Sequence, residues 1–138
     1  MSVAIIYWSG TGNTEAMAGL VAQGAGSDSN MKAVSAATID DVKNATAVAF
    51  GCPSMGDEVL EESEFQPFMD SVMEAVKGKK VGLFGSYGWG DGRWMREWVE
   101  TMKTAGADVI DEGIIVNGAP AGEDEEKCIE LGKKLATI

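Results

Sequence analysis

The segment from Ser9 to Thr14 (SGTGNT) combines three hydroxyls, two glycines and an amide within six residues. It follows the apolar run Val3–Trp8 and precedes the amphipathic segment Glu15–Val21, so it lies where a buried strand leads into a helix. Backbone N–H groups at such a helix start, together with the helix dipole, bind anions. The sequence therefore predicts a phosphate-binding loop at residues 9–14.

The composition of this loop favours one terminal phosphate over a polyphosphate. The first basic residue of the chain is Lys32, so the loop lacks the lysine of a Gly-Lys-Ser/Thr phosphate loop. A dinucleotide-binding turn needs a third glycine where this chain has Glu15. A neutral loop of amides and hydroxyls remains, and it suits a monophosphate. The simpler alternative is a glycine-rich turn in which Asn13 or Thr14 caps the helix.

Two other loops carry side chains suited to a planar ligand. One contains the soft thioether of Met55, a conformationally free Gly56 and the carboxylate of Glu58, which can accept a hydrogen bond from an imide N–H. The other, Ser86–Gly92, places Trp89 between two glycines, which leaves its ring open to a ligand. The alternative for Trp89 is a core residue at the start of a helix.

Apolar runs alternate with segments of helical periodicity along the chain. The predicted strands are Val3–Tyr7, Met31–Ala36, Ala47–Phe50, Lys80–Phe84 and Val109–Val116. The predicted helices are Glu15–Val21, a short Asp40–Asn44, and stripes running from Phe65 to Val76, from Met95 to Met102 and from Cys128 to Leu135. This order predicts an α/β fold in which a parallel sheet of about five strands is covered by helices on both faces. The three loops then lie outside the carboxyl ends of strands, where such sheets bind ligands.

Composition limits the class of protein. The chain has 138 residues, 45% of them hydrophobic, and we expect residues 1–138 to form a single domain. The net charge of −11 argues against nucleic acid as a partner and favours basic partners. The absence of histidine excludes imidazole ligands and histidine-based catalysis, and we predict neither a metal site nor catalytic residues.

Location and redox state are also expectations from composition. The chain has no apolar run of membrane-spanning length and no secretion leader, so we expect a cytoplasmic protein without a membrane partner. We expect Cys52 and Cys128 to be free buried thiols. The acidic residues between Asp57 and Glu74 leave two interpretations open, a solvated helix face or a functional surround of the ligand site.

Three stretches resemble the cofactor loops of flavodoxins, most of all the short-chain flavodoxins of clostridia and related anaerobes. They are YWSGTGNTE from Tyr7, MGDE from Met55 and LFGSYGWGDG from Leu83, in that order, within a likeness that runs from residue 3 almost to the end. The resemblance implies a flavodoxin-like three-layer sandwich with strand order 2-1-3-4-5, for which flavodoxin itself, with FMN at the switch point, is the standard example.

The resemblance also implies the function. It implies that a non-covalent FMN serves as a low-potential one-electron carrier between redox proteins, through a stabilised neutral semiquinone, in a monomer that docks on basic surfaces and is not an enzyme. The alternative is a related flavoprotein dedicated to activating one enzyme, such as a ribonucleotide reductase. A phosphorelay receiver and a cysteine phosphatase do not fit, because Gly51-Cys52 and Glu58 stand where those classes need an aspartate and an arginine.

By the same resemblance the cofactor contacts can be assigned to positions of this chain. Met55 flanks the inner face of the flavin ring, Trp89 stacks on its outer face and Glu58 accepts from N3–H. The Gly56–Asp57 peptide offers its carbonyl to N5–H after reduction. The residues implied at the phosphate are Ser9, Gly10, Thr11, Gly12, Asn13 and Thr14, with Ser54 as a weaker contributor, and the further implied cofactor contacts are Ser86, Tyr87, Gly88 and Gly90.

Overall fold

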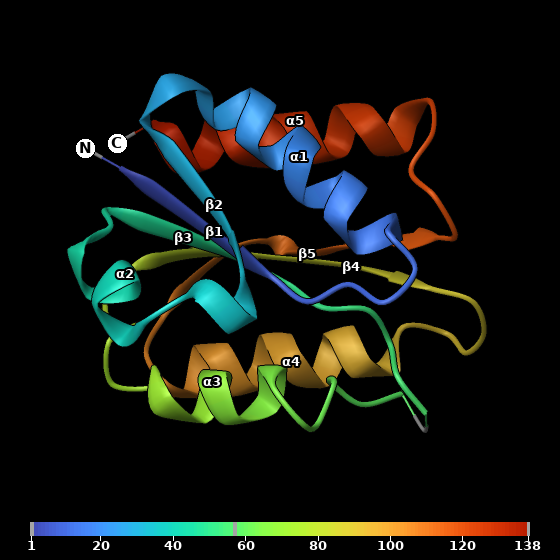
Figure 1. Ribbon diagram of the computed structural model, residues 1–138, viewed down its shortest axis with the longest axis horizontal. Helices are drawn as coiled ribbons and strands as arrows, with labels where there is room; N and C mark the ends of the chain where they lie inside the picture. Colours follow the sequence, from blue (N-terminus) through green and yellow to red (C-terminus); the bar gives the residue numbers. More distant parts are fainter. Residues whose placement is uncertain (1, 57, 138) are drawn as a thin grey trace.

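The computed structural model describes residues 2–56 and 58–137. Its centre is a parallel five-stranded sheet in the order β2-β1-β3-β4-β5, with α1 and α5 on one face and α2, α3 and α4 on the other (Figure 1). The strands are β1 (Val3–Tyr7), β2 (Ser29–Ala33), β3 (Ala47–Gly51), β4 (Lys80–Tyr87) and β5 (Asp108–Asn117). The helices are α1 (Asn13–Ala25), α2 (Ile39–Asn44), α3 (Phe65–Ser71), α4 (Arg93–Thr104) and α5 (Glu123–Ala136), with short 3₁₀ turns η1 (Gly26–Asp28) and η2 (Val34–Ala36). The predicted three-layer α/β fold and its strand order are confirmed.

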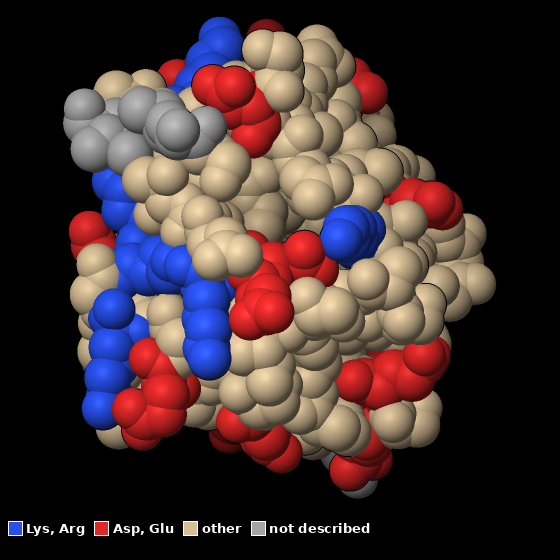
Figure 2. All heavy atoms as spheres, turned by 60° about the vertical axis from the view of Figure 1, so that its left-hand side comes forward, with Lys and Arg blue, Asp and Glu red and all other residues tan. Residues whose placement is uncertain are grey.

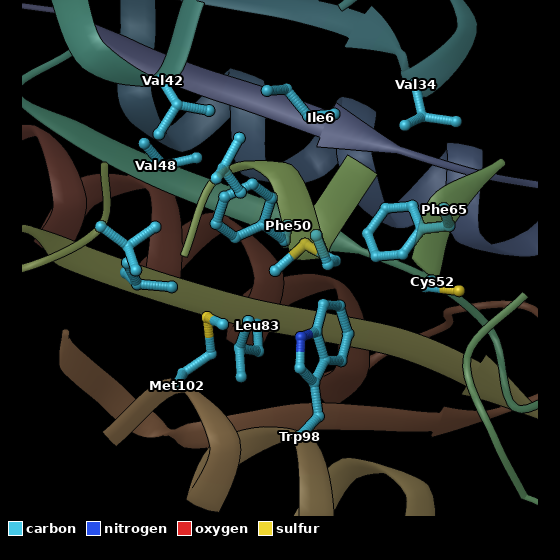
Figure 3. Packing of buried hydrophobic residues seen from close by; sticks show 14 of the residues in the cluster. Ile6, Val34, Val42, Val48, Phe50, Cys52, Phe65, Leu83, Trp98 and Met102 are labelled. Atoms are coloured by element: carbon cyan, nitrogen blue, oxygen red, sulfur yellow. The ribbon is translucent and has the colours of Figure 1, made fainter. Parts of the chain in front are cut away.

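The core lies on both faces of the sheet because successive side chains of a strand point to opposite faces. Ile5 of β1 packs under α1 and α5, whereas Ile6 packs with the cluster under α3 and α4. In that second cluster Phe50, Leu83 and Trp98 meet between the sheet and the helices (Figure 3). The methionine and aromatic stripes predicted from Phe65 and from Met95 are buried except for Phe68 and Met73, which are partly buried and pack against the same cluster, so the prediction of core positions is confirmed.

Three strand boundaries differ from the prediction by more than one residue. The edge strand predicted at Met31–Ala36 is β2, Ser29–Ala33, and pairing stops there because Ala33 lies opposite Tyr7, the last residue of β1. β4 runs to Tyr87 rather than Phe84, because it keeps its partner β5 as far as the pair Tyr87 and Asn117. Ser86 and Tyr87, predicted in a loop, are therefore the last residues of a strand.

The helix predicted from Phe65 to Val76 ends earlier, at Ser71. From Val72 onward the chain continues in hydrogen-bonded turns, in which Val76 donates to the carbonyl of Val72, up to Gly78. Val72 and Val76 are nevertheless buried. The spacing of apolar residues thus predicted correctly which side chains are buried, but it did not predict where the regular helix ends.

α1 and α5 cross at a very short distance because glycines lie at the crossing. A Cβ atom added to Gly24 of α1 would lie 1.8 Å from the carbonyl oxygen of Ile129, and one added to Gly132 of α5 would lie 2.0 Å from the carbonyl oxygen of Val21. Neither contact can relax by a side-chain rotation, since both involve backbone. The two glycines therefore set the distance between the helices that cover this face of the sheet.

The amino end of α3 is satisfied by Glu61, which precedes the helix. Its Oε1 accepts from the amides of Glu64 and Phe65 at 2.8 and 2.9 Å, and its Oε2 accepts from the amide and hydroxyl of Ser63. Desolvation raises the pKa of this buried carboxyl, but these hydrogen bonds outweigh it and lower the pKa from its usual 4.5 to about 2. This member of the acidic segment is neither a solvated residue nor a ligand contact.

We expect Gly24→Ala to destabilise the protein by roughly 1–3 kcal/mol or more, because the methyl group has no space at the helix crossing. Gly19→Ala in the same helix is the matched control, since its Cβ would meet no atom within 4 Å. It should stabilise the protein by up to about 1 kcal/mol through helix propensity. Urea unfolding measures both, and equal effects of the two substitutions would contradict the assigned crossing.

We expect Glu61→Gln to lower the free energy of unfolding at pH 7 and to lose this effect in acid. Because the folded-state pKa is depressed, the ionised carboxylate stabilises the fold above pH 4.5, and this contribution is lost as the pH falls towards 2. The wild-type and mutant stabilities should therefore converge below pH 4.5. Glu62→Gln, an exposed neighbour, should change stability by less than about 0.5 kcal/mol at either pH.

Candidate cofactor site

The loop between β1 and α1 is shaped by Gly12 and by the hydroxyl of Ser9. Gly12 is the N-cap residue of α1 and has a φ of 97°, in the region that favours glycine. The Oγ of Ser9 accepts hydrogen bonds from the amides of Gly12 and Glu15, at 3.0 and 3.3 Å. Neither Asn13 nor Thr14 caps the helix as the simpler interpretation required, since both lie inside it and Gly12 makes no side-chain cap.

Three amides at this helix start have no acceptor within the protein. The N–H groups of Thr11, Asn13 and Thr14 donate to no acceptor among residues 2–56 and 58–137. They stand at the positive end of the α1 dipole. The hydroxyl of Ser9 already accepts two hydrogen bonds, so its own hydrogen remains available to donate. This donor set fits a phosphate group, which is acceptor-only when fully ionised.

The carboxylate in the first turn of α1, that of Glu15, is hydrogen-bonded to another side chain. Oε2 of Glu15 accepts from the hydroxyl of Tyr7 at 3.1 Å. Desolvation and the nearby Glu15 carboxylate raise the pKa of Tyr7, so the phenol keeps its proton and the pair persists at neutral pH. Lys32 is paired with Asp41 at 3.0 Å. An anion at the loop must therefore be held by amides and hydroxyls.

Beside this loop a groove of about 300 Å³ runs along the carboxyl edge of the sheet, a volume at the lower end of the range for ligand sites. It is formed by the ends of β1, β3 and β4 and the start of α1. Its lining residues are Trp8, Gly10, Thr11, Asn13, Pro53, Ser54, Met55, Ser86, Tyr87, Gly88 and Gly118. Half of the predicted cofactor residues line it. Ser9, Gly12 and Thr14 form the loop behind its end, and Gly56, Glu58, Trp89 and Gly90 lie outside its lining.

Met55 and Val59 close a short hairpin next to the groove. Each donates its amide to the other's carbonyl, at 2.9 and 3.0 Å, and Gly56 at the tip has a φ of 47°. Asp57, which was assigned a cofactor contact, lies outside the described residues. Glu58 is buried, and its Oε1 accepts from the amides of Gly92 and Arg93 at the start of α4.

Trp89 is the most exposed large hydrophobic side chain among the described residues, with 62% of its surface accessible. The alternative that Trp89 is a core residue at the start of α4 is therefore wrong. Trp94, five residues later, occupies the core at that helix start and donates its indole N–H to the carbonyl of Cys52. The indole of Trp89, exposed between two glycines, is therefore open to contact with a planar ligand.

Three lining residues were missed by the assignment of cofactor contacts. Trp8 packs on the phosphate loop, since a Cβ on Gly10 would lie 3.1 Å from its ring, and its indole donates to Glu64 at 3.2 Å. Gly118 accepts from the hydroxyl of Ser86 at 2.6 Å and thereby joins the loop after β5 to the groove. Pro53 lies two residues after the end of β3. Their position just after strand ends was the available signal, because those ends meet at one edge.

Two other hollows lack these features. One of about 190 Å³ lies between α3 and α4, and one of about 580 Å³ lies between β5 and α5. The larger is lined mostly by charged side chains of α5, among which Lys134 forms an ion pair with Asp111. Neither is formed by a helix start with open amides. The groove beside Gly12 is therefore the best candidate for a phosphorylated cofactor.

None of the helices in the described residues has both the length and the apolar content needed to span a lipid bilayer.

Among known proteins, the flavodoxin family model matches residues 5–132. A flavodoxin of Clostridium beijerinckii is 53% identical over 97% of this chain and 99% of its own length, and one of Megasphaera elsdenii is 45% identical over 97% and 98%.

The fold agrees with these sequences. The solution structure of two-electron reduced Megasphaera elsdenii flavodoxin superposes with a TM-score of 0.89, covering 99% of both chains. The resemblance found in the three loops is thus confirmed over the whole length, at an identity that leaves the family in no doubt. The chain belongs to the flavodoxin family, whose members carry FMN and transfer electrons between redox proteins rather than catalyse a reaction.

Proposed function

We propose that residues 1–138 form one FMN-binding domain that carries electrons singly and at low potential. When bound, the flavin ring accepts an electron from one redox protein and gives it to another. The observation that carries the proposal is the start of α1, where the amides of Thr11, Asn13 and Thr14 are open beside a groove. Relatives matched over 98–99% of their own lengths support the single domain.

The chain's residues have separate tasks in this proposal. The loop from Ser9 to Thr14 holds the phosphate, with Ser54 in the groove beside it. Met55 and Trp89 provide the two walls for the ring, and Glu58 accepts from its imide N–H. Gly56 supplies the conformational freedom for its peptide bond with the next residue to turn its carbonyl towards the ring after reduction. Ser86, Tyr87, Gly88 and Gly90 complete the ring end.

We propose that the partners are redox proteins with basic docking surfaces, because charge is unevenly distributed. Helices begin at the carboxyl edge of the sheet, and acidic residues gather there, as in the first turn of α5, which holds four. Lysines gather at the opposite edge, where Lys79 and Lys80 precede and begin β4 and Lys133 and Lys134 end α5. Figure 2 looks onto the side with the chain termini and shows basic side chains gathered on one part of it. The cofactor edge thus presents negative charge, which attracts partners with basic surfaces.

We also propose that the protein acts as a monomer in the cytoplasm. Cys52 and Cys128 are free thiols and both are buried, which fits a reducing compartment. Burial and desolvation raise the pKa of Cys52 to about 12 and that of Cys128 to about 11, so neither thiol is ionised at neutral pH. The two cysteines are therefore core residues in this proposal, without a redox role.

We expect FMN to bind much more tightly than riboflavin, and Thr14→Ala to reduce that difference. A hydrogen bond to a charged group contributes about 1.5–3 kcal/mol, so the substitution should weaken FMN roughly 10- to 150-fold. Riboflavin affinity should be unchanged, because riboflavin has no phosphate. Titration of the apoprotein by flavin fluorescence measures both, with the exposed Thr104→Ala of α4 as control. Equal affinity of the wild type for the two flavins would overturn the phosphate assignment.

We expect the exposed acids near the cofactor edge to lower the second one-electron potential. Neutralising Glu62 and Asp91 together should raise it by roughly 10–20 mV per charge, since a charge about 10 Å away acts with about 0.2–0.4 kcal/mol in water-like surroundings. The first potential should change little, because that electron is accompanied by a proton. Glu58 and Glu61 are left in place because both satisfy helix starts.

The control for this charge effect is neutralisation of Asp28 and Glu74, two exposed acids near the opposite edge. That variant should leave both potentials unchanged. The rate of electron transfer to a basic partner should fall with salt in the wild type, and less steeply in the Glu62 and Asp91 variant. Identical salt dependence in all three proteins would contradict docking at the cofactor edge.

A further inference from the structure

Glu58 connects two loops that are far apart in the sequence. It is 6% exposed, and its Oε1 accepts hydrogen bonds of 3.1 Å from the amides of both Gly92 and Arg93. Those amides belong to the N-cap and first residue of α4. This carboxylate belongs to the hairpin between Met55 and Val59, next to the cofactor groove, and it stabilises the start of α4. Hydrogen bonds from amides at a helix start are strongest to an ionised group.

The space for this carboxylate exists because residue 90 is glycine. A Cβ atom on Gly90 would lie 2.6 Å from both Cδ and Oε1 of Glu58, closer than any real contact of a Cβ atom. Gly90 also has a φ of +89°, so two independent constraints act on it. The glycine on the other side of Trp89 differs, because a Cβ on Gly88 would meet no atom within 4 Å.

The backbone of Glu58 is itself constrained. Its φ is 58°, in the left-handed region that side-chain-bearing residues seldom adopt. Such a conformation persists only where the surroundings hold it. Here the paired amides and carbonyls of Met55 and Val59 hold one side, and the two hydrogen bonds from α4 hold the carboxylate. The side chain is thus fixed at both of its ends in the protein without cofactor.

We propose that Gly90 and the amino end of α4 are the positioning elements that orient Glu58 towards the flavin. The amides of Gly92 and Arg93 both donate to Oε1 of Glu58, and neither donates to Oε2. The Nε of Arg93 lies 3.9 Å from Oε2. Oε2 is then the oxygen that accepts from the imide N–H of the ring. This inference rests on the proposed contact between Glu58 and FMN, and it adds the residues that set that contact.

The same link joins the two walls of the ring site. Met55 lies on the hairpin, Trp89 lies between Gly88 and Gly90, and the carboxylate of Glu58 ties the hairpin to the segment that follows Trp89. The two segments are therefore held to each other before FMN binds. Holding them in advance lowers the ordering cost of binding.

The test is Gly90→Ala, compared with Gly78→Ala. Gly78 has a similar φ of 72°, but its Cβ would meet no atom within 4 Å, so it reports the backbone strain alone. In the apoprotein, we expect Gly90→Ala to shift the amide proton resonances of Gly92 and Arg93, and Gly78→Ala to leave them in place. With FMN, Gly90→Ala should weaken binding roughly tenfold or more and shift the one-electron potentials, since a hydrogen bond to a charged group is lost.

A double-mutant cycle decides whether Gly90 acts through Glu58. In a Glu58→Ala background, Gly90→Ala should change FMN affinity by less than about twofold, because the methyl group then has space and no carboxylate remains to displace. An undiminished effect of Gly90→Ala in that background would overturn the inference. Thermal unfolding of all four proteins, with Gly78→Ala as reference, separates loss of folding from loss of orientation.

The two proposals can fail separately. If Gly90→Ala shifts the Gly92 and Arg93 resonances in the apoprotein while FMN affinity and both potentials stay at wild-type values, the proposed contact between Glu58 and the flavin is wrong, and the positioning role falls with it. If those resonances do not move, the positioning role is wrong even where Glu58→Ala weakens FMN.

Discussion

Each α-helix of this fold begins with backbone N–H groups that need acceptors, and the way each start is satisfied determines where an anion can bind. α2 is closed by a capping box between Thr38 and Asp41, α3 by Glu61 and α4 by Glu58. The first turn of α5 is acidic. α1 differs, because Ser9 occupies only two of its amides. In a chain with a net charge of −11, the open start of α1 is the place where a phosphate finds donors without a competing carboxylate.

This arrangement explains why local sequence was sufficient for the phosphate loop. The segment from Ser9 to Thr14 forms its turn from its own residues, and the apolar runs on either side fix where the strand ends and the helix begins. The same reasoning placed β1 and β3 almost to the residue. It misplaced the end of β4, because a strand continues for as long as its neighbour pairs with it, and the pairing of Tyr87 with Asn117 is a property of β5.

The acidic segment shows the opposite case. Glu61 lies three residues before Glu64 and four before Phe65, whose amides it accepts, so its role has a local signal that a search for helix starts could find. Glu58 accepts from amides 34 and 35 residues away, and its spacing in the sequence reveals nothing of this. Counting both as surface charge, as composition suggests, overstates the field that an exposed cluster exerts, since each is tied to a helix dipole of the opposite sign.

The phosphate end and the ring end of the site belong to different layers of the molecule. The amides that hold phosphate come from α1, on the face shared with α5, whereas the residues proposed at the ring are tied through Glu58 to α4 on the other face (Figure 1). The sheet edge joins them, with Ser54 and Ser86 in the groove between. Because the sheet separates the two layers, a substitution in one should alter its own interaction with little effect on the other. Affinity for the phosphate and the electrochemical environment of the ring can therefore vary independently, with β3 and β4 as the rigid spacer that keeps both within reach of one cofactor.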